Sequence, residues 1–180
     1  ETIRSALSQA EGGTRITMES DYTDDGTGEI AVTNGSEALP VVLDLNGYSL
    51  LLKNSLTVGD PDSPDNGALT IKDSSKKGSL RAEFPVDNVD YAIVNSGKLK
   101  IEGVTFSSLN NRLISNSGSS ADLTISDGTL KYETPAAEAD PFSMILAEGK
   151  VTVTGSSVEA GDWLYIIGAL DGGDITIDSS

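Results

Sequence analysis

Lys98-Leu99-Lys100-Ile101-Glu102 carries the pattern that decides the fold, in which two large aliphatic residues flank one residue that is usually polar. Alternation with period two puts the aliphatic pair on one face of a short strand and the middle residue on the other. The pattern recurs at steps of 24 to 30 residues, which indicates a solenoid. The seven units are Ile16-Thr17-Met18, Leu43-Asp44-Leu45, Leu69-Thr70-Ile71, Leu99-Lys100-Ile101, Leu123-Thr124-Ile125, Val151-Thr152-Val153 and Ile175-Thr176-Ile177. We therefore predict an all-β chain whose seven strands stack as about seven coils of a parallel β-helix.

Charged residues beside these units predict the register of the stack. The residues just before the last four units alternate in sign, and they are Lys98, Asp122, Lys150 and Asp174. Neighbouring parallel strands lie about 4.8 Å apart, so like charges at these places would repel. One position past the units, Lys72 would lie beside Glu102 in the same alignment.

Two sets of corner residues recur in each repeat. Glycine follows four of the units, at Gly47, Gly103, Gly128 and Gly155. A second corner precedes three units, at Asn95-Ser96-Gly97, Asn116-Ser117-Gly118 and Glu148-Gly149. Since glycine permits the backbone conformations of tight corners, this predicts a coil with several faces. Insertions rich in Pro, Asp, Ser or Gly lengthen some corners, at 59–67, 74–90 and 134–142.

The opening segment has a different pattern from the rest of the chain. Ile3, Ala6, Leu7 and Ala10 lie at helical spacing, and Gly12-Gly13 is a helix stop. We interpret 1–13 as an N-terminal capping helix and 14–180 as a single β-helix domain. No comparable cap follows Ile177, so we expect the natural chain to continue beyond Ser180 and this fragment to self-associate end to end through its uncapped last coil.

Composition excludes several classes of function. The 28 acidic residues exceed the 12 basic ones, and a net charge of −16 repels nucleic-acid phosphates, so we expect no nucleic-acid partner. The chain has neither His nor Cys, which excludes Ser-His-Asp and Cys-His catalysis and thiolate metal sites. No run reaches the 18 or so apolar residues of a membrane helix, so we expect no membrane insertion.

Val42-Leu43-Asp44-Leu45-Asn46-Gly47-Tyr48, after the Gly12-Gly13-Thr14-Arg15-Ile16 start and before the Asn-x-Gly corners, resembles the pectate-lyase-like β-helices of bacterial surface proteins. The resemblance implies a single-stranded right-handed parallel β-helix, the hand that parallel crossovers usually take. It also implies an extracellular or cell-surface location in bacteria. Many activities use this fold, including polysaccharide lyases, hydrolases and adhesins, so the resemblance does not fix the chemistry.

Two sets of charged residues could serve a carbohydrate-active enzyme. Paired carboxylates of a glycoside hydrolase could come from the outward residues Asp44, Asp122 and Asp174. A lyase acting with calcium could use the basic group Lys72, Lys76, Lys77 and Arg81. We interpret both sets as solvated, charge-paired surface and assign no catalytic residue and no cofactor.

Acidic turns raise the question of calcium. Asp60, Asp62 and Asp65 lie within eight turn-prone residues, but Pro64 occupies a ligand place and no closing Glu follows, so the loop does not fit an EF-hand. We interpret this loop, and the group Asp21, Asp24 and Asp25, as acidic surface turns. No metal site is assigned, and calcium at the first loop is left open.

Two further surfaces could bind a ligand. Thr at the middle of five units could match an ice lattice, although Asp44 and Lys100 interrupt the row and threonine is also a good strand former. Trp163, with Tyr132 or Tyr165, could stack on a sugar ring, but such aromatics more often cover a loop. We favour the structural interpretation of both.

The sequence thus predicts a non-catalytic extracellular module, adhesin-like, that acts as a rigid spacer or a binding surface. Its expected partner is a glycan or a host or cell-surface protein, and the binding residues are unknown. The alternative is a polysaccharide lyase or glycoside hydrolase whose substrate lies along one face of the β-helix.

Overall fold

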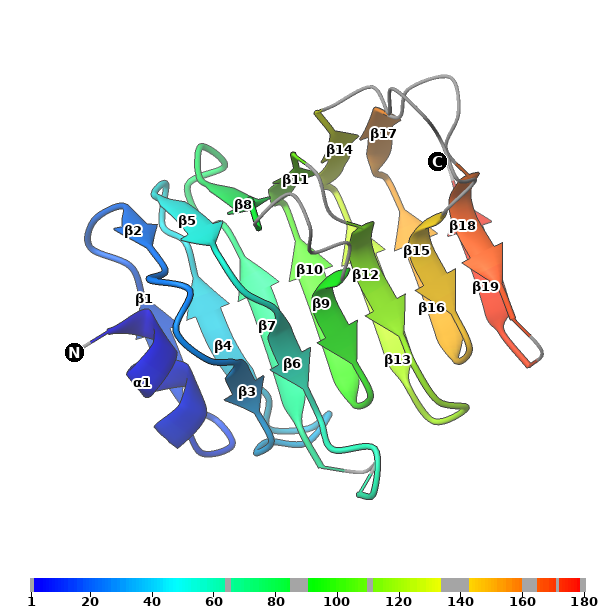
Figure 1. Cartoon of the computed structure of the whole chain (residues 1–180), viewed down its shortest axis with the longest axis horizontal. Helices are drawn as coiled ribbons and strands as arrows, with labels where there is room; N and C mark the ends of the chain where they lie inside the picture. Colours follow the sequence, from blue (N-terminus) through cyan, green and yellow to red (C-terminus); the bar gives the residue numbers. More distant parts are fainter. Residues whose placement is uncertain are drawn as a thin grey trace.

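A computed structural model describes residues 2–63, 66–84, 91–109, 112–133, 143–159, 165–170 and 172–178, which form a parallel β-helix with one short N-terminal helix (Figure 1). Three sheets form the coil. Sheet I contains β1 (Arg15–Thr17), β4 (Val41–Asp44), β7 (Ala68–Lys72), β10 (Lys98–Glu102), β13 (Asp122–Ser126), β16 (Lys150–Thr154) and β19 (Asp174–Asp178). Sheet II contains β2 (Tyr22–Thr23), β5 (Ser49–Leu52), β8 (Ser79–Ala82), β11 (Thr105–Ser108), β14 (Thr129–Tyr132) and β17 (Ser157–Glu159). Sheet III contains β3 (Ile30–Val32), β6 (Leu56–Val58), β9 (Tyr91–Asn95), β12 (Arg112–Asn116), β15 (Ser143–Ala147) and β18 (Tyr165–Ala169).

The chain visits the three sheets in turn, and each strand pairs in parallel with the equivalent strand one coil later. All seven predicted strands are present in sheet I, but they enclose about five turns rather than the predicted seven. The first and last strands are end strands, with Ile16 only half-buried and Ile177 65% exposed, so five strands lie fully inside the stack. The predicted right hand of the coil stays a prediction of the crossover rule.

A narrow column of aliphatic side chains fills the coil. The pairs of β7, β10, β13 and β16 are all buried, and sheets II and III add inward residues such as Leu80, Phe106, Ile93 and Ile114. Burying one such side chain stabilises the fold by about 1.5–3 kcal/mol. The column is therefore the main source of stability, and it confirms the predicted alternation.

The predicted register is confirmed for the later coils. Lys98 pairs with Asp122, Asp122 with Lys150, and Lys150 with Asp174 in sheet I. Glu102 likewise lies opposite Lys72.

The alignment of the first two units with the others was wrong by two residues. Leu43 pairs with Ile71, not with Leu69, and Asp44 lies opposite Lys72. A shift of two residues keeps every side chain on the same face, so alternation cannot detect it. Val41, Leu43 and Leu45 are all buried, and they offer two overlapping aliphatic pairs to the next strand.

The corner between sheets III and I shows why some glycines are required. Gly59, Gly67 and Gly97 come from neighbouring coils and meet backbone to backbone. A Cβ on Gly97 would lie 2.1 Å from the carbonyl oxygen of Gly67, which no side chain can tolerate. The predicted corner glycine therefore serves close approach of the backbone here rather than a positive φ.

Helix α1 (Ile3–Gln9) covers the first coil, as predicted, although it ends before Gly12. The Thr2 hydroxyl accepts a hydrogen bond from the Ser5 amide, which is the usual N-cap arrangement. Leu7 enters the core column. Arg4 donates to the buried carboxylate of Asp24 at 2.5 Å and fastens the helix to the coil. Among the described residues, no helix has the length and apolarity needed to cross a membrane.

Two asparagines stack inside the corner between sheets III and I. The Nδ2 of Asn95 donates to the Oδ1 of Asn116 at 2.6 Å, and the Nδ2 of Asn116 donates to the Lys150 carbonyl at 3.0 Å. Both side chains are fully buried. Each side-chain amide thus forms hydrogen bonds with backbone groups that the corner shields from water. In the next coil Ala147 occupies the position equivalent to Asn116.

Replacing Asn116 by alanine should lower the free energy of unfolding by about 1–3 kcal/mol, because it leaves buried partners without a hydrogen bond. Ser117→Ala in the same corner is the matched control and should change it by much less. Urea unfolding followed by circular dichroism measures both variants. Equal stability of N116A and S117A would contradict the structural role given to the asparagine pair.

Candidate functional site

The outward carboxylates predicted for a hydrolase do not lie together. The prediction that Asp44 points outward was wrong. Its side chain is only 4% exposed, and it accepts hydrogen bonds from the backbone amides of Asn46 at 3.1 Å and Ser74 at 3.0 Å. Asp122 lies in the outward charge row, 3.3 Å from the ammonium of Lys150. Asp174 lies in the same row two strands farther along. Asp44 belongs to a corner because of the two-residue shift of β4.

The predicted threonine row is changed by the same shift. The outward row of sheet I contains Arg15, Val42, Thr70, Lys100, Thr124, Thr152 and Thr176. Thr17 pairs with Asp44 and lies outside this row. With Arg15, Val42 and Lys100 among seven places, the row is a poor match for a regular hydroxyl lattice.

Two of the predicted basic residues are held in ion pairs. Lys72 lies 3.5 Å from Asp44, and Arg81 lies 2.9 Å from Glu133. Lys76 and Lys77 are exposed in the turn between β7 and β8. Three of the four basic side chains therefore come from the end of β7 or the corner between β7 and β8, and Arg81 comes from sheet II. Two of the four, Lys72 and Arg81, are paired with carboxylates.

The structure describes only part of the loop with Asp60, Asp62 and Asp65, for which calcium binding was left undecided. Asp60 accepts a hydrogen bond from the Asp62 amide at 2.9 Å, and Asp65 lies outside the described residues. Within the described part of the chain, no three acidic residues gather as metal ligands would. In the other acidic group, Asp24 is engaged by Arg4 and Asp21 accepts from the Ser49 amide at 2.8 Å.

The aromatic residues considered for sugar stacking are also separated. Trp163 lies outside the described residues, as does the side chain of Tyr165. Tyr132 is half-buried against the core column, and burial raises the pKa of its hydroxyl. A different aromatic, Tyr91 in sheet III, carries the guanidinium of Arg112 over its ring at 5.4 Å.

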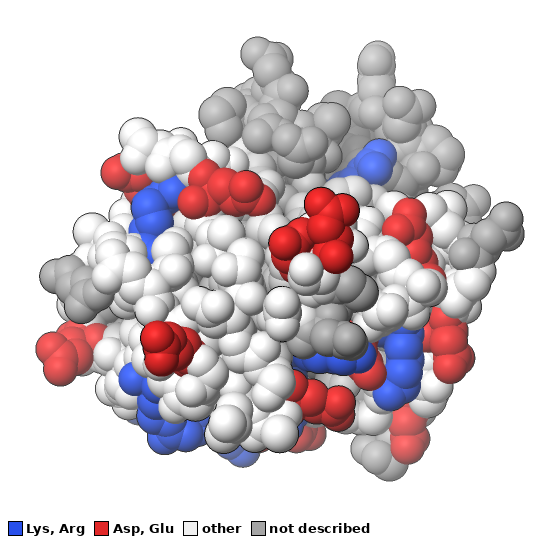
Figure 2. Space-filling view, turned by 90° about the horizontal axis from the view of Figure 1, so that it is seen from below, with Lys and Arg blue, Asp and Glu red and all other residues white. Residues whose placement is uncertain are grey.

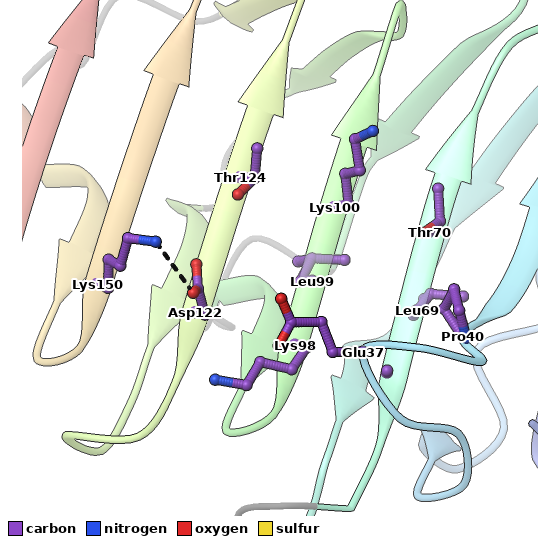
Figure 3. A pocket seen from close by; sticks show the side chains of 11 residues that line it. Glu37, Pro40, Leu69, Thr70, Lys98, Leu99, Lys100, Asp122, Thr124 and Lys150 are labelled. Atoms are coloured by element: carbon purple, nitrogen blue, oxygen red, sulfur yellow. Dashed lines mark hydrogen bonds and ion pairs between the residues drawn. The ribbon is translucent and has the colours of Figure 1, made fainter.

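Figure 3 shows a groove on the outside of sheet I, which we call the loop groove. The segment before β4 forms one wall with Glu37 and Pro40, and strands β7, β10, β13 and β16 form the floor. Thr70, Thr124 and Lys100 line the floor beside the charge row Lys98, Asp122 and Lys150. Its volume is 210 Å³. It places two carboxylates, Glu37 and Asp122, on one hollow, which sequence reasoning did not bring together.

A longer hollow follows the outside of sheet III, which faces the viewer in Figure 1, and we call it the sheet III furrow. Three adjoining hollows of 700, 440 and 600 Å³ make it up. The first two share Pro61, Val94 and Ser96, and the last two share Gly118, Ser119 and Glu148. The furrow therefore crosses successive coils along the axis of the β-helix.

Uncharged polar side chains, nearly all of them hydroxyls, make up half of the described lining of this furrow. The uncharged polar residues are Thr33, Asn54, Ser55, Thr57, Tyr91, Ser96, Ser115, Ser117, Ser119 and Ser120. The charged residues among its lining are Glu29, Asp60 and Glu148, all acidic. Figure 2, which views the molecule from below, shows small charged clusters separated by wide uncharged areas. The sequence had pointed to the Asn-Ser-Gly corners that supply part of this lining, but only as turns.

The buried corner carboxylates are ionised at neutral pH. Burial alone would raise the pKa of Asp73, but the amides of Gly78, Gly47 and Ser75 donate to it and hold the pKa below its usual range. Asp44 shows the same balance, with burial opposed by the amides of Ser74 and Asn46 and by Lys72, so its pKa is also lowered. Both acids are structural, since their oxygens accept the hydrogen bonds that close the corner between sheets I and II.

Comparisons with protein-family models, with curated proteins and with solved structures find no match for this chain. The β-helix therefore rests on the sheet topology and register described above. The pectate-lyase-like type, the surface location and the ligand have no relative to support them, and they are proposals.

Replacing Asp73 by asparagine should lower the free energy of unfolding by about 1–3 kcal/mol at pH 7, because the amide cannot accept all the hydrogen bonds that the carboxylate accepts. The lowered pKa of Asp73 means that its ionised form stabilises the fold above the unfolded pKa of about 3.9 and that this contribution is lost as the pH falls through the lower folded value. The difference between wild type and D73N should therefore shrink in acid. Urea titrations at pH 7 and pH 3, with the exposed Asp62→Asn as control, measure it, and a difference that grows in acid would contradict the assignment.

Proposed function

We propose that the chain is a non-catalytic, adhesin-like module of a bacterial surface or secreted protein, and that it presents a glycan-binding face on a rigid spacer. The sheet III furrow is the observation that carries this proposal. A furrow that crosses several coils fits an extended polymer better than a compact metabolite. At about 4.8 Å per strand, the six strands of sheet III span roughly 24 Å.

The chemistry of the lining supports a glycan. Hydroxyl and amide groups both donate and accept hydrogen bonds, as sugar hydroxyls do, and Val94 and Pro61 offer apolar contact between them. The furrow is built on paired strands, so the lining needs little reordering when a ligand binds. The pectate-lyase-like kinship and the right hand of the coil belong to the same proposal.

Contacts of the charged residues favour binding over catalysis. The carboxylates of Asp44 and Asp73 accept hydrogen bonds from backbone amides at the corners, and the carboxylate of Asp24 accepts one from Arg4. Lys72 and Arg81 are held by carboxylates, while a lyase would need basic groups free to meet a substrate. The alternative of a glycoside hydrolase rests on the loop groove, where Glu37 and Asp122 line the same hollow.

Substitution of Val94 by arginine should reduce glycan binding at least tenfold, because the long side chain fills the place where the first two hollows meet. Thr152→Arg is the matched control, since it puts the same side chain on an outward strand position of sheet I. A glycan array followed by calorimetry on the best oligosaccharide measures the effect. Equal loss in both variants, or no binding to any glycan, would contradict the proposal.

Cleavage of a polysaccharide would distinguish the proposed binding module from the alternative of a glycoside hydrolase or lyase. The protein is incubated with a polysaccharide panel while the absorbance of unsaturated uronates and the release of reducing ends are followed. We expect neither signal. Cleavage that is lost in both Glu37→Gln and Asp122→Asn would establish the hydrolase alternative and place it in the loop groove.

End-to-end association is proposed as a second property. Ile177 in β19 is 65% exposed, and Ile166 and Leu170 of the last coil are 41% and 47% exposed. A strand of a second copy could pair with the free edge of β19 and cover Ile177.

Ile177→Lys should therefore abolish concentration-dependent association of the protein in sedimentation velocity. Leu39→Lys changes an equally prominent leucine, 61% exposed, on the segment before β4, and it should leave association intact. A wild-type profile that stays monomeric at millimolar concentration would contradict the proposal.

A further inference from the structure

The two hollows differ in their charged groups, which are of both signs in the loop groove and acidic in the sheet III furrow. Lys98, Lys100 and Lys150 line the loop groove together with two carboxylates. The sheet III furrow has Glu29, Asp60 and Glu148 and no basic side chain among its described lining residues. Two basic side chains contact lining residues from outside the lining, Lys98 at the Ser120 carbonyl and Arg112 at Tyr91. The carboxylates of the lining and the −16 charge of the chain disfavour uronates and sulfated sugars.

We propose that the sheet III furrow selects glycans that carry free amino groups, such as de-N-acetylated amino sugars, over neutral and acidic glycans. This inference rests on the proposed function and names the ligand class of the same furrow. An ammonium group on the sugar would meet the carboxylates, and the ring hydroxyls would meet the serine and threonine side chains between them.

The three carboxylates keep hydrogen-bonding capacity for a ligand. Glu148 accepts one hydrogen bond from the Gly118 amide at 2.8 Å, and Asp60 accepts one from the Asp62 amide at 2.9 Å. Glu29 accepts from the Thr57 hydroxyl. A carboxylate has about four acceptor positions, so each could still receive an ammonium hydrogen. The donors to Glu148 and Glu29 belong to the lining residues Gly118 and Thr57, so these two carboxylates are held beside the furrow.

The carboxylates also lie at different places along the furrow. Glu29 and Asp60 line the first hollow, and Glu148 lines the second and third. An oligomer with several amino groups could therefore reach more than one of them at once. Such a ligand gains from each contact, and a single amino sugar would not.

A basic peptide is the competing ligand, and the backbone arrangement disfavours it. Extended peptides commonly bind by adding a strand to a free sheet edge. The furrow runs across sheet III from β3 to β18. Its central strands β6, β9 and β12 each pair on both sides, and among the described strands of this sheet only the end strands β3 and β18 have a single neighbour. Its floor thus presents side chains rather than free backbone groups, as suits a ligand made of hydroxyls and amines.

The experiment compares a glucosamine hexamer with its N-acetylated counterpart and with a galacturonate hexamer of equal length, by calorimetry at low and moderate salt. We expect the glucosamine hexamer to bind most tightly, its affinity to fall with salt, and the galacturonate hexamer not to bind. The double variant Glu29→Gln, Glu148→Gln should weaken the glucosamine hexamer about fivefold and leave the acetylated hexamer unchanged. Glu11→Gln with Glu19→Gln removes the same charge from exposed residues outside the lining and is the control.

The outcomes separate this inference from the proposed function. Equal binding of the amino and acetylated hexamers would overturn the selectivity and leave glycan binding intact. Absence of binding to all three hexamers and to the wider glycan array would overturn both. A lysine hexapeptide that binds as tightly as the glucosamine hexamer, with the same loss in the double variant, would show that the furrow takes cations in general and would overturn the assignment to amino sugars.

Discussion

Parallel stacking of inward aliphatic pairs is the constraint on which the rest of this structure depends. Each strand is too short to be stable alone, and its buried face is covered only by the equivalent residues of the coils before and after it. Leu99 and Ile101 lie between Leu69 and Ile71 on one side and Leu123 and Ile125 on the other. This arrangement fixes the register, and the register then decides which polar residues share a face.

The corners convert that repetition into a closed coil. A change of sheet removes backbone groups from their ladders, and at two kinds of corner buried polar side chains replace the lost partners. Asp73 accepts amide hydrogens between sheets I and II, and Asn95 and Asn116 do so between sheets III and I. The buried acids and amides Asp24, Asp44, Asp73, Asn95 and Asn116 therefore stabilise the coil, and the recognition that we propose is assigned to the outward faces.

The two outward hollows arise from different features of the solenoid. The loop groove exists because the segment before β4 folds over the start of the sheet I strands. The sheet III furrow follows the coils themselves and inherits their repetition, so a repeating polymer could match it at several places. This difference is the physical reason for assigning the extended ligand to sheet III and keeping the loop groove for the catalytic alternative.

The sequence by itself determined the parallel strands, the inward pairs and the register of the later coils, because period-two alternation and the alternating charges at Lys98, Asp122 and Lys150 are local signals. It could not place Asp44, since a shift of two residues preserves the alternation, and only pairing with Lys72 revealed the corner. Nor could it find the furrow, because Glu29, Ser96 and Glu148 are far apart in the chain. Only the tertiary structure brings them to one surface, since that depends on how long each corner insertion is and where each coil closes.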